Sequence, residues 1–164
     1  MSDSVPNYLF VKEEVSLREY KMYKYLHNME LPFIPKLYRY DKTTRKLDMQ
    51  RIIGMSVADF YGEAFDCVPK KIISEIRNII RYLYNIGVVY PDITGYNFIV
   101  DKNSKLWIID FEHCFYINNL QNKNDIIFDK FDKFDNNIPD KDENINFVVN
   151  FSFNNENNWN KYFM

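Results

Sequence analysis

The chain has 164 residues, of which 46% are hydrophobic and 18% aromatic, so it is long enough for one compact domain with a packed core. Its 21 basic and 23 acidic residues give a net charge of −2, which argues against a nucleic-acid backbone as partner. No segment reaches the roughly 18 consecutive apolar residues that span a bilayer, and Cys67 and Cys114 form no CxxC pair typical of zinc sites. We expect a globular, cytoplasmic protein with free thiols that binds neither membrane nor nucleic acid.

The first third of the chain predicts a small sheet with one helix. Aromatic and β-branched residues at 8–12 favour a short strand that ends in a lysine. A capping-box pattern and apolar residues at helical spacing predict a helix over 16–28. Residues 36–40 and 46–50 then have the pattern of two strands joined by a turn at 41–45. We expect this hairpin to lie beside the first strand.

The middle of the chain predicts a long helix followed by a tight hairpin. Gly54 marks a connection, and residues 57–61 favour a short helix. Apolar residues recur at i, i+3, i+4 and i+7 along 69–85, which is typical of a helix with one buried face. Two short apolar strands at 98–100 and 106–109 flank residues that favour a turn. The two strands should therefore pair directly.

After Tyr116 the chain is rich in Asn, Asp and Lys, with phenylalanines at intervals. Such a segment is either a loop-rich tail held by aromatic anchors or partly disordered. Residues 145–153 alternate apolar and polar side chains, which favours an extended strand. The abundance of Asn and Lys is equally explained by the codon usage of an AT-rich genome, which would carry no function.

Three polar side chains near the predicted hairpin form the candidate catalytic constellation. Asp92 and Asn97 have D-x-x-x-x-N spacing directly after an extended segment, and Asp110 ends the second strand of the hairpin. Because the second strand returns beside the first, we expect Asp110 to lie next to Asn97. Phosphoryl transfer needs Mg²⁺ held by hard oxygen ligands and a carboxylate that accepts the proton of the attacking hydroxyl. The alternative is that Asp92 and Asn97 only cap turns.

The segments 87–100 and 106–113, with Asp92-x-x-x-x-Asn97 and Asp110-Phe-Glu, resemble the protein-kinase-like superfamily of protein kinases, aminoglycoside phosphotransferases and choline or ethanolamine kinases. The resemblance implies a kinase that uses ATP and Mg²⁺, with Asp92 as catalytic base and with Asn97 and Asp110 as metal ligands. Asp-Phe-Glu in place of Asp-Phe-Gly is more similar to the small-molecule branch.

The resemblance extends upstream to the cofactor-binding residues. Lys12 resembles the lysine that binds the nucleotide phosphates, and Glu19 resembles its helix partner. By position, Gln50 and Ile52 lie in the segment that resembles the adenine-binding hinge. Glu19 has an alternative role as the last residue of the capping box that Ser16 begins, and this alternative stays open.

The predicted fold class is α+β, a reduced protein-kinase-like fold with a small N-terminal sheet plus helix and a trimmed C-terminal lobe. We expect an N-terminal lobe at 1–53, a half with the catalytic loop and metal motif at 54–116, and an Asn-rich segment of the same domain at 117–164. Too few residues precede Lys12 for a glycine-rich lid, so the lid would be absent or supplied by a partner chain.

The expected activity is transfer of the γ-phosphoryl group of ATP to a hydroxyl. The first expectation for the acceptor is a protein Ser/Thr hydroxyl, as the D-x-x-x-x-N spacing favours, and the second is a small-molecule hydroxyl, as Asp-Phe-Glu favours. The competing hypothesis is a pseudokinase, a non-catalytic scaffold or assembly subunit such as one of a virus, which would place it in the host cytoplasm or the virion. The apparent lack of a lid favours the scaffold, whereas retention of Asp92, Asn97 and Asp110 favours the enzyme.

Overall fold

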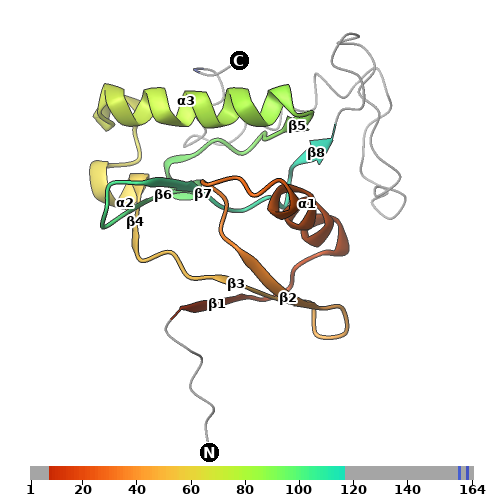
Figure 1. Ribbon diagram of the computed structural model, residues 1–164. Helices are drawn as coiled ribbons and strands as arrows, with labels where there is room; N and C mark the ends of the chain where they lie inside the picture. Colours follow the sequence, from red (N-terminus) through yellow and green to blue (C-terminus); the bar gives the residue numbers. More distant parts are fainter. Residues whose placement is uncertain (1–7, 117–158, 160–161, 163–164) are drawn as a thin grey trace, which may run out of the picture.

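The N-terminal third forms a small antiparallel sheet with one helix, as the sequence predicts. The computed structural model describes residues 8–116 together with Trp159 and Tyr162 (Figure 1). The first elements in chain order are β1 (Leu9–Lys12), α1 (Leu17–Asn28), β2 (Leu37–Asp41) and β3 (Lys46–Gln50). The strand order is β1-β3-β2. The amide of Glu19 donates to Ser16 Oγ at 3.0 Å, so the predicted N-cap of the helix is confirmed.

The second region is a sheet covered by the longest helix. Its elements in chain order are β4 (Gly54–Ser56), α2 (Val57–Tyr61), η1 (Phe65–Cys67), α3 (Lys70–Asn85), β5 (Val88–Val89), η2 (Gly95–Asn97), β6 (Phe98–Asp101), β7 (Leu106–Ile108) and β8 (Phe115–Tyr116). One sheet has the order β4-β6-β7, and β5 pairs with β8. In Figure 1, α3 lies on one side of the β4-β6-β7 sheet and the β1-β3-β2 sheet lies on the other.

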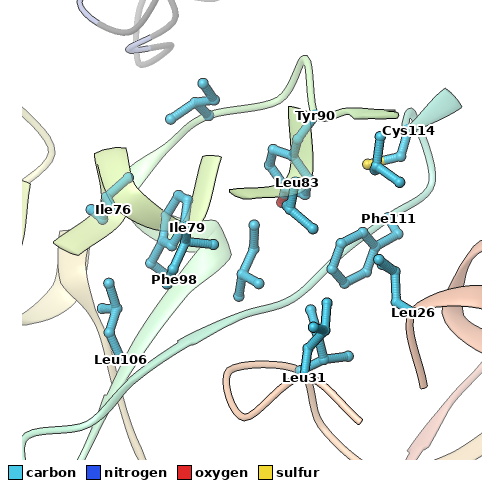
Figure 2. Packing of buried hydrophobic residues seen from close by; sticks show 14 of the residues in the cluster. Leu26, Leu31, Ile76, Ile79, Leu83, Tyr90, Phe98, Leu106, Phe111 and Cys114 are labelled. Carbon is cyan, nitrogen blue, oxygen red and sulfur yellow. The ribbon is translucent and has the colours of Figure 1, made fainter. Parts of the chain in front are cut away.

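One continuous hydrophobic core joins the two regions. Ile76 and Leu83 of α3 are fully buried, and they belong to the same cluster as Leu26 of α1 and Phe98 of β6 (Figure 2). Each such side chain contributes roughly 1.5–3 kcal/mol by leaving water. The helical periodicity along 69–85 is therefore the pattern of a helix that packs on the predicted hairpin, and both elements are confirmed.

Gly54 differs from its expected role as a plain connection. It begins β4 and pairs with Asp101 of β6. A Cβ added at Gly54 would lie 2.2 Å from the carbonyl oxygen of Val100, so any larger residue would collide with the neighbouring backbone. Glycine at this position permits close strand pairing. A single glycine in the sequence does not show whether it lies in such a strand or in a turn.

Three further predictions concern membrane spans, the strand at 145–153 and the division of the chain. Among the residues that the structure describes, no helix has both the length and the apolar character that crossing a membrane requires. The predicted strand at 145–153 lies outside the described residues. The division of the chain at 53/54 and 116/117 stays a prediction.

Candidate active site

A lysine between two carboxylates lies where the two regions meet. Lys12 ends β1, Glu19 lies in the first turn of α1, and Asp110 follows β7. Lys12 Nζ is 2.5 Å from Glu19 Oε1 and 3.0 Å from Asp110 Oδ1. Glu19 is only 2% exposed. The structure thus brings together three of the predicted site residues, and the Glu19 carboxylate binds Lys12 in addition to lying in the capping turn.

The electrostatics of this cluster keep Lys12 positively charged. Burial lowers the pKa of Lys12, but hydrogen bonds to Glu19 and Asp110 and their negative charges outweigh it, so the pKa is raised above 10.5. Burial raises the pKa of Glu19 above 4.5, and the contact with Lys12 opposes that rise. A fixed cation is therefore present at neutral pH beside Asp110, as recognition of an anionic ligand requires.

A cavity of about 460 Å³ opens beside the Lys12 ammonium group. Its lining residues are Phe10, Lys12, Tyr23, Pro35, Met49, Gln50, Arg51, Ile52, Ile99, Ile109 and Asp110. Four predicted site residues, Lys12, Gln50, Ile52 and Asp110, are thus found around one space. The volume falls within the range of about 300–1,000 Å³ that is typical of small-molecule sites. A larger cavity, of about 780 Å³, has only Gln50 in common with the residues that line this one.

Asp92 and Asn97 form a second, local cluster. The side-chain amide of Asn97 donates to the backbone carbonyl and to Oδ2 of Asp92, both at 2.9 Å. Asn97 is 8% exposed, and its amide nitrogen is occupied by these bonds, so Oδ1 is the atom that can act as a hard ligand. The amide of Ile109 donates to the carbonyl of Asn97 at 2.9 Å, which places Asp110 one residue from that contact, as the hairpin predicts.

Two tyrosines that have no predicted role in the site bind the backbone around Asp110. The amide of Asp110 donates to the Tyr23 hydroxyl at 3.0 Å, and the Tyr90 hydroxyl donates to the carbonyl of Ile109 at 2.6 Å. Burial raises the pKa of Tyr23 and of Tyr90 well above 10, so both hydroxyls stay neutral. The sequence indicates Tyr23 only as one position of the helical pattern at 16–28, and no local pattern reveals its bond to Asp110.

Trp159, which lies outside both sequence motifs, also contacts the candidate site. It is buried, at 2% exposed. Its backbone amide donates to the carbonyl of Ile93 at 2.7 Å, immediately after Asp92 in the chain. Trp159 and Ile93 are far apart in the chain, so no local sequence pattern indicates this contact.

The donor set suits a metal ion that arrives with a phosphate ligand. Within the described residues, no group of three or more His, Cys, Asp and Glu side chains is arranged to hold a metal by itself. Mg²⁺ bound to a nucleotide commonly uses one or two protein oxygens together with phosphate and water oxygens. The Asp110 carboxylate and the Asn97 carbonyl oxygen match that smaller requirement.

Similar proteins are kinases. A 3-deoxy-D-manno-octulosonic acid kinase of Photobacterium profundum is 25% identical over 79 residues, covering 48% of this chain and 31% of that protein. The kinase PK-1 of Cydia pomonella granulovirus has 18% identity and a TM-score of 0.53, covering 68% of this chain and 44% of its own. The structure of the Rad53 kinase domain and SCD2 has 18% identity and a TM-score of 0.51, covering 63% and 41%. The chain spans less than half the length of each.

These structural likenesses show the fold, and they confirm the predicted reduced kinase-like α+β architecture. The RIO domain family model matches residues 3–126, a span that includes both clusters described above. The chain therefore belongs to the RIO domain family, within the protein-kinase-like superfamily that its sequence resembles.

Proposed function

We propose that this chain is a phosphotransferase that binds Mg²⁺-ATP in the cavity beside Lys12 and transfers the γ-phosphoryl group to a hydroxyl. The observation that carries the proposal is the Lys12 ammonium, held by Glu19 and Asp110, on the wall of a nucleotide-sized cavity. Membership of a kinase-like family supports use of ATP. This geometry and the resemblance of Asp92-x-x-x-x-Asn97 and Asp110-Phe-Glu to kinase motifs support the roles of the individual side chains.

Each side chain has a role in the proposed reaction. Lys12 binds nucleotide phosphate, Glu19 holds Lys12 in place, and the backbone from Gln50 to Ile52 faces the base. Asn97 and Asp110 hold Mg²⁺, which when bound neutralises charge on the phosphates.

Asp92 accepts the proton of the acceptor hydroxyl and orients its oxygen toward the γ-phosphorus; as that oxygen bonds to phosphorus, the bond to the oxygen that bridges the β- and γ-phosphates breaks and ADP leaves. Its own carboxylate is in turn oriented by the side-chain amide of Asn97.

The proposed acceptor is a hydroxyl of a small molecule or of a protein Ser/Thr. The similarity to a 3-deoxy-D-manno-octulosonic acid kinase favours the small-molecule acceptor, because that protein's name describes a sugar-acid substrate. Asp-Phe-Glu at 110–112 favours the same branch. Turnover should therefore be compared with sugar acids, simple alcohols and a casein-like protein.

The deciding experiment is thermal unfolding with and without Mg²⁺-ATP. A ligand at a hundred times its dissociation constant stabilises the native state by about 2.7 kcal/mol. We expect a shift of this kind for the wild type and none for Asp110→Asn, which keeps the side-chain shape but removes the charge. Asp66→Asn, on the exposed η1 turn, is the matched control and should shift like the wild type. Absence of a shift in the wild type at millimolar Mg²⁺-ATP would refute the proposal and leave the scaffold hypothesis.

A further inference from the structure

The loop that contains Asp92 and Asn97, residues 92–97, is tied to a residue distant in sequence. The backbone amide of Trp159 donates to the carbonyl of Ile93 at 2.7 Å, and its indole Nε1 donates to the carbonyl of Glu63 at 3.0 Å. Glu63 lies between α2 and η1. Trp159 thus bonds on one side to the 92–97 loop and on the other to the segment that follows α2.

The indole ring also rests directly on the backbone of this loop. A Cβ added at Gly95 would lie 2.8 Å from Trp159 Cη2 and 3.0 Å from the Cβ of Ala58 in α2. Gly95 is buried and begins η2, the short turn that ends at Asn97. Because only a hydrogen atom fits between ring and backbone, the position of the ring determines the position of the turn that carries Asn97.

Neighbouring rings fix the indole in turn. Phe65 of η1 packs edge-on against Trp159, with ring centroids 5.8 Å apart. Tyr162, whose amide donates to the carbonyl of Trp159 at 2.9 Å, stacks on Phe65 with 3.9 Å between ring centroids. The ring that touches Gly95 is therefore itself held by η1 and by Tyr162.

We propose that Trp159 is a positioning residue of the active site. By bonding to Ile93 and packing on Gly95, it holds the 92–97 loop so that Asp92 faces the acceptor and Asn97 faces the metal. Trp159 acts through the loop and not on the reacting atoms. The proposal rests on the function proposed above for Asp92 and Asn97, and it goes beyond that function by assigning a role to a residue outside both sequence motifs.

Hydrogen exchange tests the structural part without any activity measurement. We expect Trp159→Ala to speed exchange of the amides at 93–98 by about tenfold or more, while amides in the β1-β3-β2 sheet keep their rates. Trp159→Phe keeps an aromatic ring beside Phe65 but loses the bond to Glu63 and the contact of the outer indole ring with Gly95, so its effect should be smaller than that of Trp159→Ala. Gly95→Ala leaves Trp159 intact but displaces the ring, so it should speed exchange in the same amides.

The matched control is Trp107→Ala, which removes the other buried tryptophan, on β7. Exchange that rises evenly through the molecule in Trp159→Ala, or that rises at 93–98 no more than in Trp107→Ala, would show that Trp159 serves the core alone and would overturn the proposal. A Gly95→Ala variant with wild-type exchange would overturn it as well. If Trp159→Ala does not fold, Trp159→Phe and Gly95→Ala still decide.

Kinetics test the functional part. Because an error of about 1 Å in placing a catalytic group can cost up to about 100-fold in rate, we expect Trp159→Phe and Gly95→Ala to lower kcat for Mg²⁺-ATP turnover by about 10- to 100-fold. KM for ATP should change less than kcat, since Lys12 and the Gln50–Ile52 segment lie elsewhere and only Asn97 of the proposed nucleotide site moves with the loop. A rise in KM with unchanged kcat would contradict the positioning role. A wild type that fails to bind Mg²⁺-ATP would refute the proposed function, whereas the exchange experiment would still report on the loop.

Discussion

The two clusters of the candidate site are held together by different forces. Lys12 meets Glu19 and Asp110 through side-chain charges, across sequence separations of 7 and 98 residues. Asp92 and Asn97 are five residues apart and are joined by two hydrogen bonds of 2.9 Å within one loop, against which Trp159 packs. The first cluster should therefore respond to changes of charge and pH, and the second to changes of packing.

This difference means that nucleotide binding and phosphoryl transfer should be separable by mutation. A change in the charged cluster weakens the interaction with phosphate in ground state and transition state alike. A change in the loop leaves the residues that line the cavity beside Lys12 in place, and it moves Asp92, which faces the proposed acceptor, together with Asn97, which is proposed to hold the metal. The experiments below measure whether the two clusters separate in this way.

The largest effect is expected for Asp92→Ala. Loss of a positioned acid or base lowers turnover by about 10²- to 10⁴-fold, while nucleotide affinity should stay near that of the wild type. Turnover and nucleotide titration of the same variant provide the measurement. If Asp92 only caps a turn, the variant should instead lose about 1 kcal/mol of folding stability with no selective kinetic change.

Lys12→Met should weaken binding of Mg²⁺-ATP by about 10- to 100-fold, since a hydrogen bond to a charged group contributes about 1.5–3 kcal/mol. Lys46→Met is the matched control, because Lys46 also pairs with a glutamate, Glu13, at 2.8 Å, but on the exposed surface. Isothermal titration of both variants with Mg²⁺-ATP tests the assignment. Equal affinities for the two variants would contradict a phosphate-binding role for Lys12.

Lys12→Met should also make folding stability depend on pH. Without Lys12, burial and the charges of Asp110 and Glu112 act on Glu19 unopposed, so its pKa rises further above 4.5. The native state of the variant then binds the proton of Glu19 more tightly than the unfolded state does. Protonation of Glu19 stabilises the native state fully at a pH below the pKa of Glu19 in the unfolded chain, and this stabilisation is lost as the pH rises through the higher pKa of Glu19 in the folded protein. Urea unfolding from about pH 4.5 to about pH 8 should show a growing deficit relative to wild type. A deficit in unfolding free energy that does not change with pH would show that the variant loses packing interactions and not the effect of the Lys12 charge on Glu19.

The smallest effect is expected for Tyr23→Phe, which removes the hydroxyl that accepts from the Asp110 amide. Loss of one such bond costs about 1 kcal/mol of unfolding free energy. Denaturant unfolding measures this cost, with Tyr38→Phe on the exposed face of β2 as control. If Asp110 depends on this bond for its orientation, Mg²⁺-ATP affinity should also fall by a few fold. Unchanged affinity would show that Tyr23 contributes to folding stability alone.

Local patterns in the sequence predicted most of the described elements and the positions of Lys12, Glu19 and Asp110 relative to them. Ser16 begins its helix through a contact three residues away, and Asn97 bonds to a partner five residues away, so short windows contain the needed information. The bonds of Tyr23 to Asp110 and of Trp159 to Ile93 join residues far apart in the chain. Such contacts depend on how whole elements pack, and a single sequence contains no local pattern for them.

The left-handed backbone of Asp110 has a consequence for selection. With φ at 64°, this residue adopts a conformation that costs of order 1 kcal/mol for most side chains and that Asn tolerates as readily as Asp. Burial is the main cause of the raised pKa of Glu19, and the negative charge of Asp110 adds to it, so this carboxylate opposes the ionised form of Glu19 while it pairs with Lys12. Replacement by Asn removes that repulsion and the ion pair with Lys12 together, without added backbone cost. The backbone therefore does not select between Asp and Asn at this residue, so a preference for Asp comes only from its charge, through Lys12 and through the proposed chemistry.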